Sequence, residues 1–190
     1  MDNRISSKSP KAINIAFDII KNGGLIIYPT DTLYGFGGDA RKENVINNIN
    51  NLKKRTGPIS ILVSNLDMAF DVLDLNSEEK KMVGIKIGGG NTVIGPAKNG
   101  VVSDKILGED ATVGVRIPEH TFGTQLVEKL GSPITTTSVN ETGKPPLNNP
   151  EQIMKQFGSS IDLLVDDGPL PNSLGSKIYK LVNSTFELVR

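Results

Sequence analysis

The sequence predicts an α/β protein: a single domain with a twisted mixed sheet of parallel and antiparallel strands, flanked by helices. Two observations predict this class. Short apolar runs typical of strands alternate with segments whose apolar residues recur at helical spacing, and the last two runs follow each other closely, as in a hairpin. The 190 residues, 37% of them hydrophobic, suffice for one sizeable core. No repeat or linker divides the chain, so we expect one domain over residues 1–190.

The first half of the chain is expected to alternate between helices and strands. Ser9 and Pro10 are typical of a helix start, and Gly23-Gly24 of its end. The next helix is expected over about residues 43–53, because four apolar residues share one face: Val45, Ile46, Ile49 and Leu52. The strands expected in this half cover residues 25–28 and 59–63.

Three further helices are expected in the second half. Asn76 and Glu79 can form a capping box at the start of the first. The second carries apolar residues at helical spacing and ends at Gly131, and the third starts at Asn149 and Pro150. The expected strands cover residues 92–94, 112–117, 134–137, 161–165, 177–182 and 186–189, the last two joined by a tight turn at 183–184.

The composition excludes several classes of site. The 21 basic and 21 acidic residues give a formal net charge of zero, which argues against a large nucleic-acid-binding surface. The absence of cysteine excludes disulfides, thiolate metal sites and a cysteine nucleophile, and the single histidine, His120, excludes multi-histidine metal sites. A Ser-His-Asp triad stays open but unsupported, and we expect a surface or capping role for His120.

The sequence also indicates where the protein works. No apolar run reaches the ~20 residues that are needed to span a bilayer. The N-terminus lacks the apolar segment of a secretory signal. We therefore expect a cytoplasmic protein without membrane contact.

Residues 28–38 combine a strand end with polar side chains and glycines. The apolar run stops at Pro29, and hydroxyl, carboxylate and phenol groups follow at Thr30, Asp31, Thr32 and Tyr34. A buried strand that ends in this way is typical of ligand sites in α/β proteins, and the glycines allow a close approach to the backbone. The same residue types also form ordinary turns, so the two interpretations are balanced for this stretch alone.

Two further clusters could bind an anion. Lys53-Lys54-Arg55 end the helix expected at 43–53, where cations favour the helix dipole. A solvated helix end is the better interpretation of this cluster alone, and a phosphate or carboxylate clamp is the alternative. The run from Thr135 to Asn140 brings hydroxyls and an amide to a strand end. Such groups form polar turns with their own backbone, and they also suit phosphate, ribose or an amino-acid carboxylate.

Two charged positions at the expected strands are ambiguous. Arg116 alternates with Val115 and Ile117, so it faces either solvent or a substrate carboxylate that it could hold with two hydrogen bonds. Asp166 and Asp167 could bind Mg²⁺, but neighbouring side chains of a strand point to opposite faces. We therefore assign no metal ligand among the protein side chains.

Taken in order, these motifs resemble the YrdC/TsaC family over about residues 10–190. The most specific is Pro-Thr-Asp-Thr-Leu-Tyr-Gly at 29–35. The others are K-x-R at 53–55, V-G-V-R-I-P at 113–118, and S-V-N-E-T-G-K-P at 138–145, which contains the S-x-N of the family. Each motif is weak alone, but four in this order form a strong signal. The resemblance implies a YrdC-like fold with an open concave ligand cleft.

The resemblance also implies an activity. Members of this family are nucleotidyltransferases that make L-threonylcarbamoyladenylate and pyrophosphate from L-threonine, bicarbonate and ATP, with Mg²⁺ accompanying ATP. Downstream enzymes transfer the threonylcarbamoyl group to tRNAs that read ANN codons, the t6A modification. These enzymes are the implied partners, and tRNA itself is a further candidate.

The roles of individual residues follow from the same resemblance. The triphosphate would be bound by Lys53, Arg55, Ser138 and Asn140, with Lys53 and Arg55 as the catalytic residues. L-threonine would be held by Thr32, Arg116 and Ser176. Arg190 would approach the nucleotide from the end of the domain.

Two segments depart from the family pattern. Residues 87–92 keep Gly89 and Thr92 of an aromatic-Pro-Gly-Pro-x-Thr segment but lose both prolines and the aromatic residue, so we expect a more flexible loop. Lys177 replaces a threonine of the late P-S-T-[IV] motif. The chain ends at Arg190, without the second domain of longer relatives, so a short single-domain form is expected.

These departures leave an alternative open: a non-catalytic member of the fold that binds tRNA, double-stranded RNA or a nucleotide. The glycines at 88–90 favour this alternative, whereas the K-x-R and S-x-N motifs and the zero net charge favour the enzyme. A carbamoyl transferase of related chemistry is disfavoured, because no partner domain is present.

Overall fold

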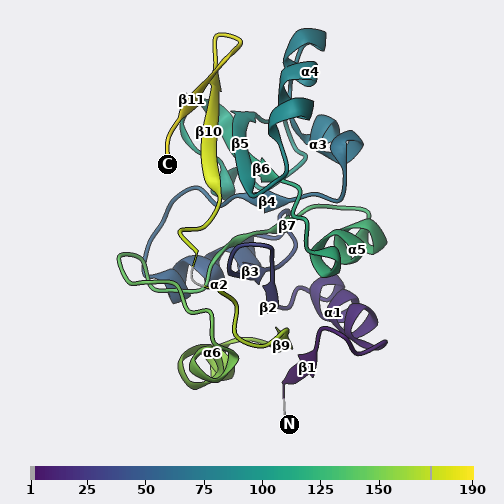
Figure 1. Ribbon diagram of the computed structural model, residues 1–190, viewed down its shortest axis with the longest axis vertical. Helices are drawn as coiled ribbons and strands as arrows, with labels where there is room; N and C mark the ends of the chain where they lie inside the picture. Colours follow the sequence, from purple (N-terminus) through teal and green to yellow (C-terminus); the bar gives the residue numbers. More distant parts are fainter. Residues whose placement is uncertain (1–2, 172) are drawn as a thin grey trace.

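The strands form two sheets that lie one above the other in Figure 1, a computed structural model that describes residues 3–171 and 173–190. One sheet has the order β1 (Arg4–Ser6), β9 (Leu163–Asp166), β2 (Ile26–Pro29), β3 (Tyr34–Gly37) and β8 (Thr137–Ser138). The other has the order β11 (Thr185–Leu188), β10 (Lys177–Val182), β5 (Asn91–Pro96), β6 (Thr112–Arg116), β4 (Ile61–Leu62) and β7 (Ile134–Thr135).

Both sheets mix parallel and antiparallel pairs. In the five-stranded sheet β9 is parallel to β1 and β2, whereas β3 is antiparallel to β2 and β8. In the six-stranded sheet β5 is parallel to β10 and antiparallel to β6, and β4 is parallel to β6. The predicted α/β class with mixed strands and flanking helices is confirmed. The expectation of one sheet is corrected to two.

The two sheets are joined at residues 134–138, where the sequence predicts one strand. The N–H of Thr135 donates to the carbonyl of Gly38 at 2.8 Å, and the N–H of Thr136 donates to the carbonyl of Ser60 at 2.7 Å. The chain thus changes partners from one residue to the next. It leaves the six-stranded sheet as β7 and enters the five-stranded sheet as β8.

The helices are α1 (Ala12–Lys21), α2 (Glu43–Lys53), α3 (Leu66–Val72), α4 (Ser77–Lys86), α5 (Thr121–Leu130) and α6 (Pro150–Phe157). Short 3-10 turns lie at Asp104–Ile106, Glu109–Ala111 and Gly158–Ser160. The capping box of Asn76 and Glu79 is confirmed. The predicted start of α1 is wrong by two residues: Ser9 and Pro10 lie in a turn whose Ser9 carbonyl accepts from Ala12 N–H at 3.0 Å, and Lys11 is the N-cap.

Three elements were not expected: β1, β3 and α3. Strand β3 contains the glycines that sequence analysis interprets as a turn or a ligand loop. A Cβ at Gly37 would lie 2.6 Å from Cε1 of Tyr28 on β2, so this strand pairs closely only because the side chain is absent. The strand expected at 59–63 is reduced to β4, and the one expected at 112–117 ends at Arg116.

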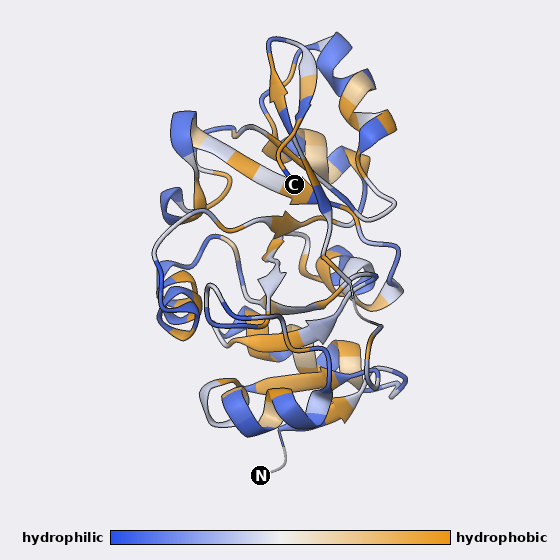
Figure 2. Ribbon diagram, turned by 60° about the vertical axis from the view of Figure 1, so that its left-hand side comes forward, coloured by the Kyte–Doolittle hydropathy of each residue, from blue (hydrophilic) through white to orange (hydrophobic). Residues whose placement is uncertain are grey.

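The two sheets share one buried core. Its apolar residues include Ile27 and Phe36 of the five-stranded sheet and Ile61 and Val93 of the six-stranded sheet. A second cluster packs α1 and α5 against β2 and β4. Figure 2 shows hydrophobic residues on the strands of both sheets, while the outer helix faces are hydrophilic. In the described part of the chain, no helix combines the length and apolar character needed to cross a bilayer.

Candidate active site

A cavity of about 530 Å³ lies where the two sheets meet. Its floor is one face of the six-stranded sheet. In the β5–β6 pair, Val93 lies opposite Val115 and Ile94 opposite Gly114, which places Thr92 beside Arg116. In the β10–β5 pair, Ile178 lies beside Thr92. The walls come from the β2–β3 turn, residues 136–138, residues 55–60 and the segment before β10. Segments that are distant in sequence therefore converge on one chamber.

Gly114 is at the centre of this floor. A Cβ there would lie 2.5 Å from Oγ of Ser60 and 3.2 Å from Cγ2 of Thr92. The absence of a side chain at Gly114 thus lets Ser60 and Thr92 pack against the β6 backbone between Arg116 and Thr112, which lie two residues to either side.

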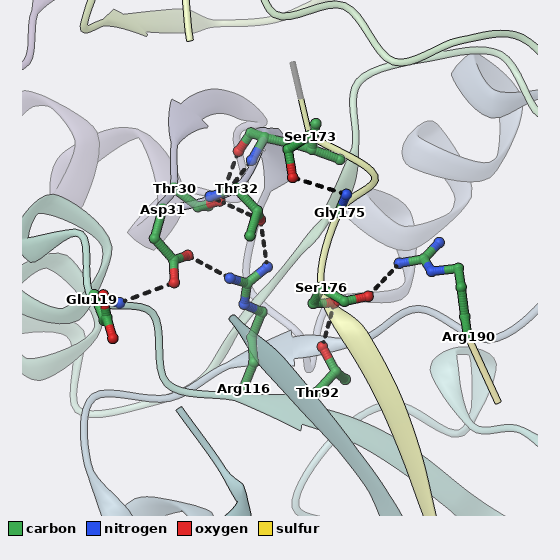
Figure 3. Close-up of polar contacts among 11 residues, drawn as sticks. Thr30, Asp31, Thr32, Thr92, Arg116, Glu119, Ser173, Gly175, Ser176 and Arg190 are labelled. Carbon is green, nitrogen blue, oxygen red and sulfur yellow. Dashed lines mark hydrogen bonds and ion pairs between the residues drawn. The ribbon is translucent and has the colours of Figure 1, made fainter. Parts of the chain in front are cut away.

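Arg116 is buried, with 6% of its surface exposed, because the β2–β3 turn covers it. Its Nη1 donates to Oγ1 of Thr32 at 3.1 Å, and its Nη2 donates to one carboxylate oxygen of Asp31 (Figure 3). The other Asp31 oxygen accepts from the N–H of Glu119 at 3.3 Å. Of the two interpretations of Arg116, solvent exposure is therefore wrong: the guanidinium lines the cavity.

Two hydroxyls lie beside this arginine. Oγ1 of Thr92 and Oγ of Ser176 are 2.8 Å apart and buried (Figure 3). The carbonyl of Ser176 accepts from Nη2 of Arg190 at 3.2 Å, which places the last residue of the chain on the cavity wall. Gly175 has a φ of +85°, and a Cβ there would be 3.2 Å from the Arg190 guanidinium, so glycine is suited to this turn.

Lys53 and Arg55 lie at the end of α2 and face different surroundings. Arg55 lines the cavity and donates from Nη2 to the carbonyl of Pro58 at 3.2 Å. Lys53 is behind the wall, 3% exposed, with its ammonium 5.9 Å from the centre of the Phe36 ring. Burial, together with the nearby charge of Arg55, lowers the pKa of Lys53 to about 8. Burial also lowers the pKa of Arg55.

The two residues of the S-x-N motif also differ in position: Ser138 lines the cavity, and Asn140 lies behind it. The Ser138 hydroxyl donates to Oδ1 of Asn140 at 2.7 Å. The Asn140 amide donates in turn to the carbonyl of Lys144 at 2.6 Å. The structure thus brings six of the eight predicted residues to one cavity, and Lys53 and Asn140 lie behind it. The six are Thr32, Arg55, Arg116, Ser138, Ser176 and Arg190.

Both internal arginines of the cavity keep an unused donor. Among the described residues, the buried Nε atoms of Arg55 and Arg116 have no hydrogen-bond partner. Leaving a buried N–H unpaired costs about 1–3 kcal/mol, so both guanidinium groups keep an unsatisfied donor beside the cavity. Carboxylate and phosphate oxygens fit the planar guanidinium.

Sequence analysis missed several lining residues. Ser60 and Lys180 have a recognisable signal: Ser60 is the polar residue of an apolar run, and Lys180 continues the period of two from Ser176 and Ile178. Glu109 has none, because it lies in a 3-10 turn outside any motif. His120 caps α5 by accepting from the N–H of Phe122 at 3.3 Å, so the expected capping role is confirmed.

The side chains offer little for a metal ion by themselves. In residues 3–171 and 173–190, no group of three or more His, Cys, Asp or Glu side chains could hold one. Glu109 is the carboxylate on the cavity lining. This arrangement fits Mg²⁺, which proteins commonly hold through one or two carboxylates together with substrate phosphates.

The glycine segment forms a defined turn beside Thr32 of the cavity lining. Gly88, Gly89 and Gly90 have φ of +100°, +55° and +77°. The N–H of Asn91 donates to the carbonyl of Gly88 at 3.0 Å, and the N–H of Lys177 donates to the carbonyl of Gly90 at 3.0 Å. A Cβ at Gly90 would be 3.8 Å from Cγ2 of Thr32, so this turn packs beside the threonines.

Comparison with known proteins agrees with this geometry. The family model of Sua5, YciO and YrdC proteins, described as "Telomere recombination", matches residues 18–190. A threonylcarbamoyl-AMP synthase of Pyrococcus abyssi is 30% identical over 171 residues, 89% of this chain and 50% of that protein. One of Nitrosococcus oceani is 31% identical over 156 residues, 80% of this chain and 84% of that protein.

A solved structure is also similar. The crystal structure of P. abyssi Sua5 complexed with L-threonine has a TM-score of 0.88 at 28% identity, covering 98% of this chain and 56% of that one. The chain therefore spans about half the length of its P. abyssi relative and most of the N. oceani one.

Proposed function

The chain belongs to the Sua5/YciO/YrdC family, and we propose that it is a threonylcarbamoyl-AMP synthase, which makes L-threonylcarbamoyladenylate and pyrophosphate from L-threonine, bicarbonate and ATP. The observation that carries this proposal is the cavity that brings together the guanidinium groups of Arg55 and Arg116, each of which has a buried Nε–H without a partner among the described residues. Further support comes from relatives that are named threonylcarbamoyl-AMP synthase and from the P. abyssi structure with L-threonine.

In this proposal Arg116 holds the carboxylate of L-threonine. Asp31 and Thr32 take one N–H from each Nη of the guanidinium, which leaves the Nε–H and one N–H on each Nη for the ligand. The Thr92–Ser176 pair lies beside Arg116, within reach of a side-chain hydroxyl two carbons from the carboxylate. A site that pairs this hydroxyl disfavours valine, since its own buried hydroxyls would lose a partner.

The nucleotide then lies toward Arg55, Ser138 and Arg190 on the remaining wall. The threonine amine and bicarbonate condense to N-carboxythreonine with loss of water. A carbamate oxygen of this compound attacks the α-phosphorus of ATP, and the bond to the pyrophosphate oxygen breaks. Negative charge increases on the phosphoryl oxygens, where the Arg55 guanidinium stabilises it.

No protein nucleophile is required for these steps. Positioning of two substrates in one chamber supplies much of the rate enhancement. Mg²⁺, when bound with ATP, would neutralise phosphate charge, with Glu109 as the lining carboxylate able to contact it. We further propose that the reaction takes place in the cytoplasm and that tRNA-threonylcarbamoylating enzymes consume the product.

The test is pyrophosphate release by the purified protein with ATP, Mg²⁺, L-threonine and bicarbonate. We expect release that requires every component and that falls at least 10²-fold in Arg55→Ala, because the charge on the phosphoryl group loses its stabilising partner. Lys105→Ala, which removes an exposed cation that pairs with the exposed Glu43, is the matched control. Binding of ATP or RNA without threonine-dependent release would contradict the synthase and favour the non-catalytic alternative.

A further inference from the structure

The residues of the K-x-R motif point in different directions because of the residue between them. Lys54 is the C-cap of α2 and has left-handed backbone angles, φ 52° and ψ 43°. The N–H groups of Lys54 and Arg55 bond back to the carbonyls of Asn51 and Asn50 at 3.1 and 3.0 Å, which closes the helix end. Arg55 then lines the cavity, whereas Lys53, the last helical residue, faces the protein interior.

The Lys53 ammonium has used all of its donors within the protein. It has three N–H groups, and three acceptors surround it: the Ser138 carbonyl at 2.6 Å, the Asn140 carbonyl at 3.1 Å and the Asn140 Oδ1 at 2.9 Å. A bond to a phosphate would require it to release one of these oxygens. The released oxygen would lose a hydrogen bond to a charged donor, which is stronger than one to a neutral donor.

All three acceptors belong to the same short loop, residues 138–142. The main chain of Lys53 also holds this loop, since its carbonyl accepts from the N–H of Thr142 at 2.9 Å. Asn140 Oδ1 accepts from both Lys53 and the Ser138 hydroxyl, so the lysine and the serine are joined through one amide oxygen. Ser138 in turn lines the cavity.

We propose that Lys53 is a positioning residue, which holds the 138–142 loop and acts on the nucleotide through Ser138 without contacting the triphosphate itself. The resemblance of the K-x-R motif implies a direct contact, and the geometry points to this different role. In this view the two charged residues of K-x-R have different roles at one helix end. Arg55 binds the ligand, and Lys53 holds the 138–142 loop that brings Ser138 to the cavity. The kinetic part of the inference rests on the proposed function, and the structural part does not.

The structural part is tested by amide hydrogen exchange of the whole protein without ligands. Lys53→Met keeps an apolar stem and removes the donors. We expect the amides of residues 138–144 to exchange at least about 10-fold faster than in wild type. The control is Lys105→Met, which removes an exposed lysine that pairs with Glu43 at the other end of α2. Unchanged protection of 138–144 in Lys53→Met would overturn the proposal.

A second variant covers the case in which Lys53→Met does not fold. Asn140→Ala removes one of the three acceptors from the loop side, at a partly exposed position. The same rise in exchange over residues 138–144 is expected, and its absence counts against a loop held through Asn140.

The kinetic part is tested by a double-mutant cycle on pyrophosphate release. If Lys53 acts through Asn140, the Lys53→Met, Asn140→Ala double variant should be within about 3-fold of the worse single variant in kcat. ATP binding should weaken no further in the double variant than in the worse single variant, because both residues act through Ser138. Losses in kcat or in ATP affinity that multiply in the double variant would show that Lys53 contacts the nucleotide independently and would overturn the proposal. If wild type releases no pyrophosphate, the proposed function fails, while hydrogen exchange still decides the role of Lys53.

Discussion

One end of the cavity depends on the buried guanidinium of Arg116, whose two Nη groups both donate to the β2–β3 turn. Asp31 and Thr32 come from the β2–β3 turn of the five-stranded sheet, whereas Arg116 comes from β6 of the six-stranded sheet. The Asp31 side chain has only 12% of its surface exposed, and it also accepts from the N–H of Glu119. The contact of Arg116 with Asp31 and Thr32 therefore links both sheets at the point where L-threonine is proposed to bind.

The first prediction concerns Arg116. In Arg116→Ala, the affinity for L-threonine should fall about 10²-fold, because the carboxylate of the ligand loses a two-point partner and the Asp31 carboxylate is left without its cation. ATP affinity should change only a few-fold. Isothermal titration with each ligand separately measures both, and Arg116→Lys is the control that keeps the charge without the planar fork. Equal losses for the two ligands would contradict the carboxylate role.

The second prediction concerns pH, because burial and the neighbouring Arg55 lower the pKa of Lys53 to about 8. Above that pH the folded protein releases a proton that the unfolded chain keeps up to its ordinary pKa of 10.5. The free energy of unfolding contributed by Lys53 should therefore rise with pH between about 8 and 10.5. The rate of pyrophosphate release should fall over the same range, since neutral Lys53 has one N–H fewer for the 138–142 loop.

Denaturant titrations and rates at several pH values measure these opposite trends. The contribution of Lys53 is the difference between the trends of wild type and those of Lys53→Met. If wild type and Lys53→Met show the same pH dependence, the shifted pKa does not belong to Lys53.

At the scale of elements, the glycine turn between α4 and β5 is a distinct conformation rather than a weakened copy of the proline-containing one. Three consecutive residues have positive φ, which proline cannot adopt and other residues rarely do. Main-chain bonds from Asn91 and Lys177 fix the turn beside Thr32, although its flexibility, predicted from the glycines, stays a prediction. The turn follows a helix whose start, the capping box of Asn76 and Glu79, is equally well defined.

The third prediction tests this turn. Restoring the family proline by Gly90→Pro should lower the free energy of unfolding by about 3 kcal/mol, because φ must change from +77° to about −65°. Threonine affinity should fall as well, since the turn packs against Thr32. Gly100→Pro is a matched control for stability alone: it has a φ of +74° and no atom within 4 Å of its Cβ position. Stabilisation or improved threonine binding by Gly90→Pro would contradict the turn described here.

At the scale of the whole molecule, the cavity lies at the junction of two sheets that share one core. Residues 134–138 cross from one sheet to the other, and the apolar cluster includes strands of both. Any relative movement of the sheets would move Arg116 against Thr32 and Ser138 against Arg55. A rigid junction therefore keeps the two ends of the cavity at a fixed spacing.

The fourth prediction follows from this shared core. Thermal unfolding should be a single transition in which the calorimetric and van't Hoff enthalpies agree. Two transitions, one for each sheet, would show that the domain predicted over residues 1–190 consists of two independent units.

The sequence predicts elements better than the contacts between them. Helix α2 and strand β10 have the expected bounds, because local periodicity and caps determine them. The division of 134–138 between two sheets depends on partners about 75–100 residues away, Ser60 and Gly38, which no local pattern specifies. The burial of Arg116 has the same cause, since alternation gives its face of the strand but not the turn that covers it.

The sequence predicted which residues belong to the candidate site but not how their side chains are arranged. Six of the eight residues implied by the family resemblance line one cavity. The different direction of Lys53 depends on a left-handed lysine at the helix end, a conformation that glycine or asparagine would have indicated and lysine does not.

Detection of the adenylate product itself tests the proposed synthase activity most directly. The protein is incubated with ATP, Mg²⁺, L-threonine and isotopically labelled bicarbonate, and the products are separated and weighed by mass spectrometry. We expect threonylcarbamoyl-adenylate that carries the label. This product should be absent when L-valine replaces L-threonine, and it should be lost in Arg55→Ala and Arg116→Ala. Hydrolysis of ATP to ADP or AMP without labelled adenylate, or equal labelling with L-valine, would contradict the proposed synthase activity.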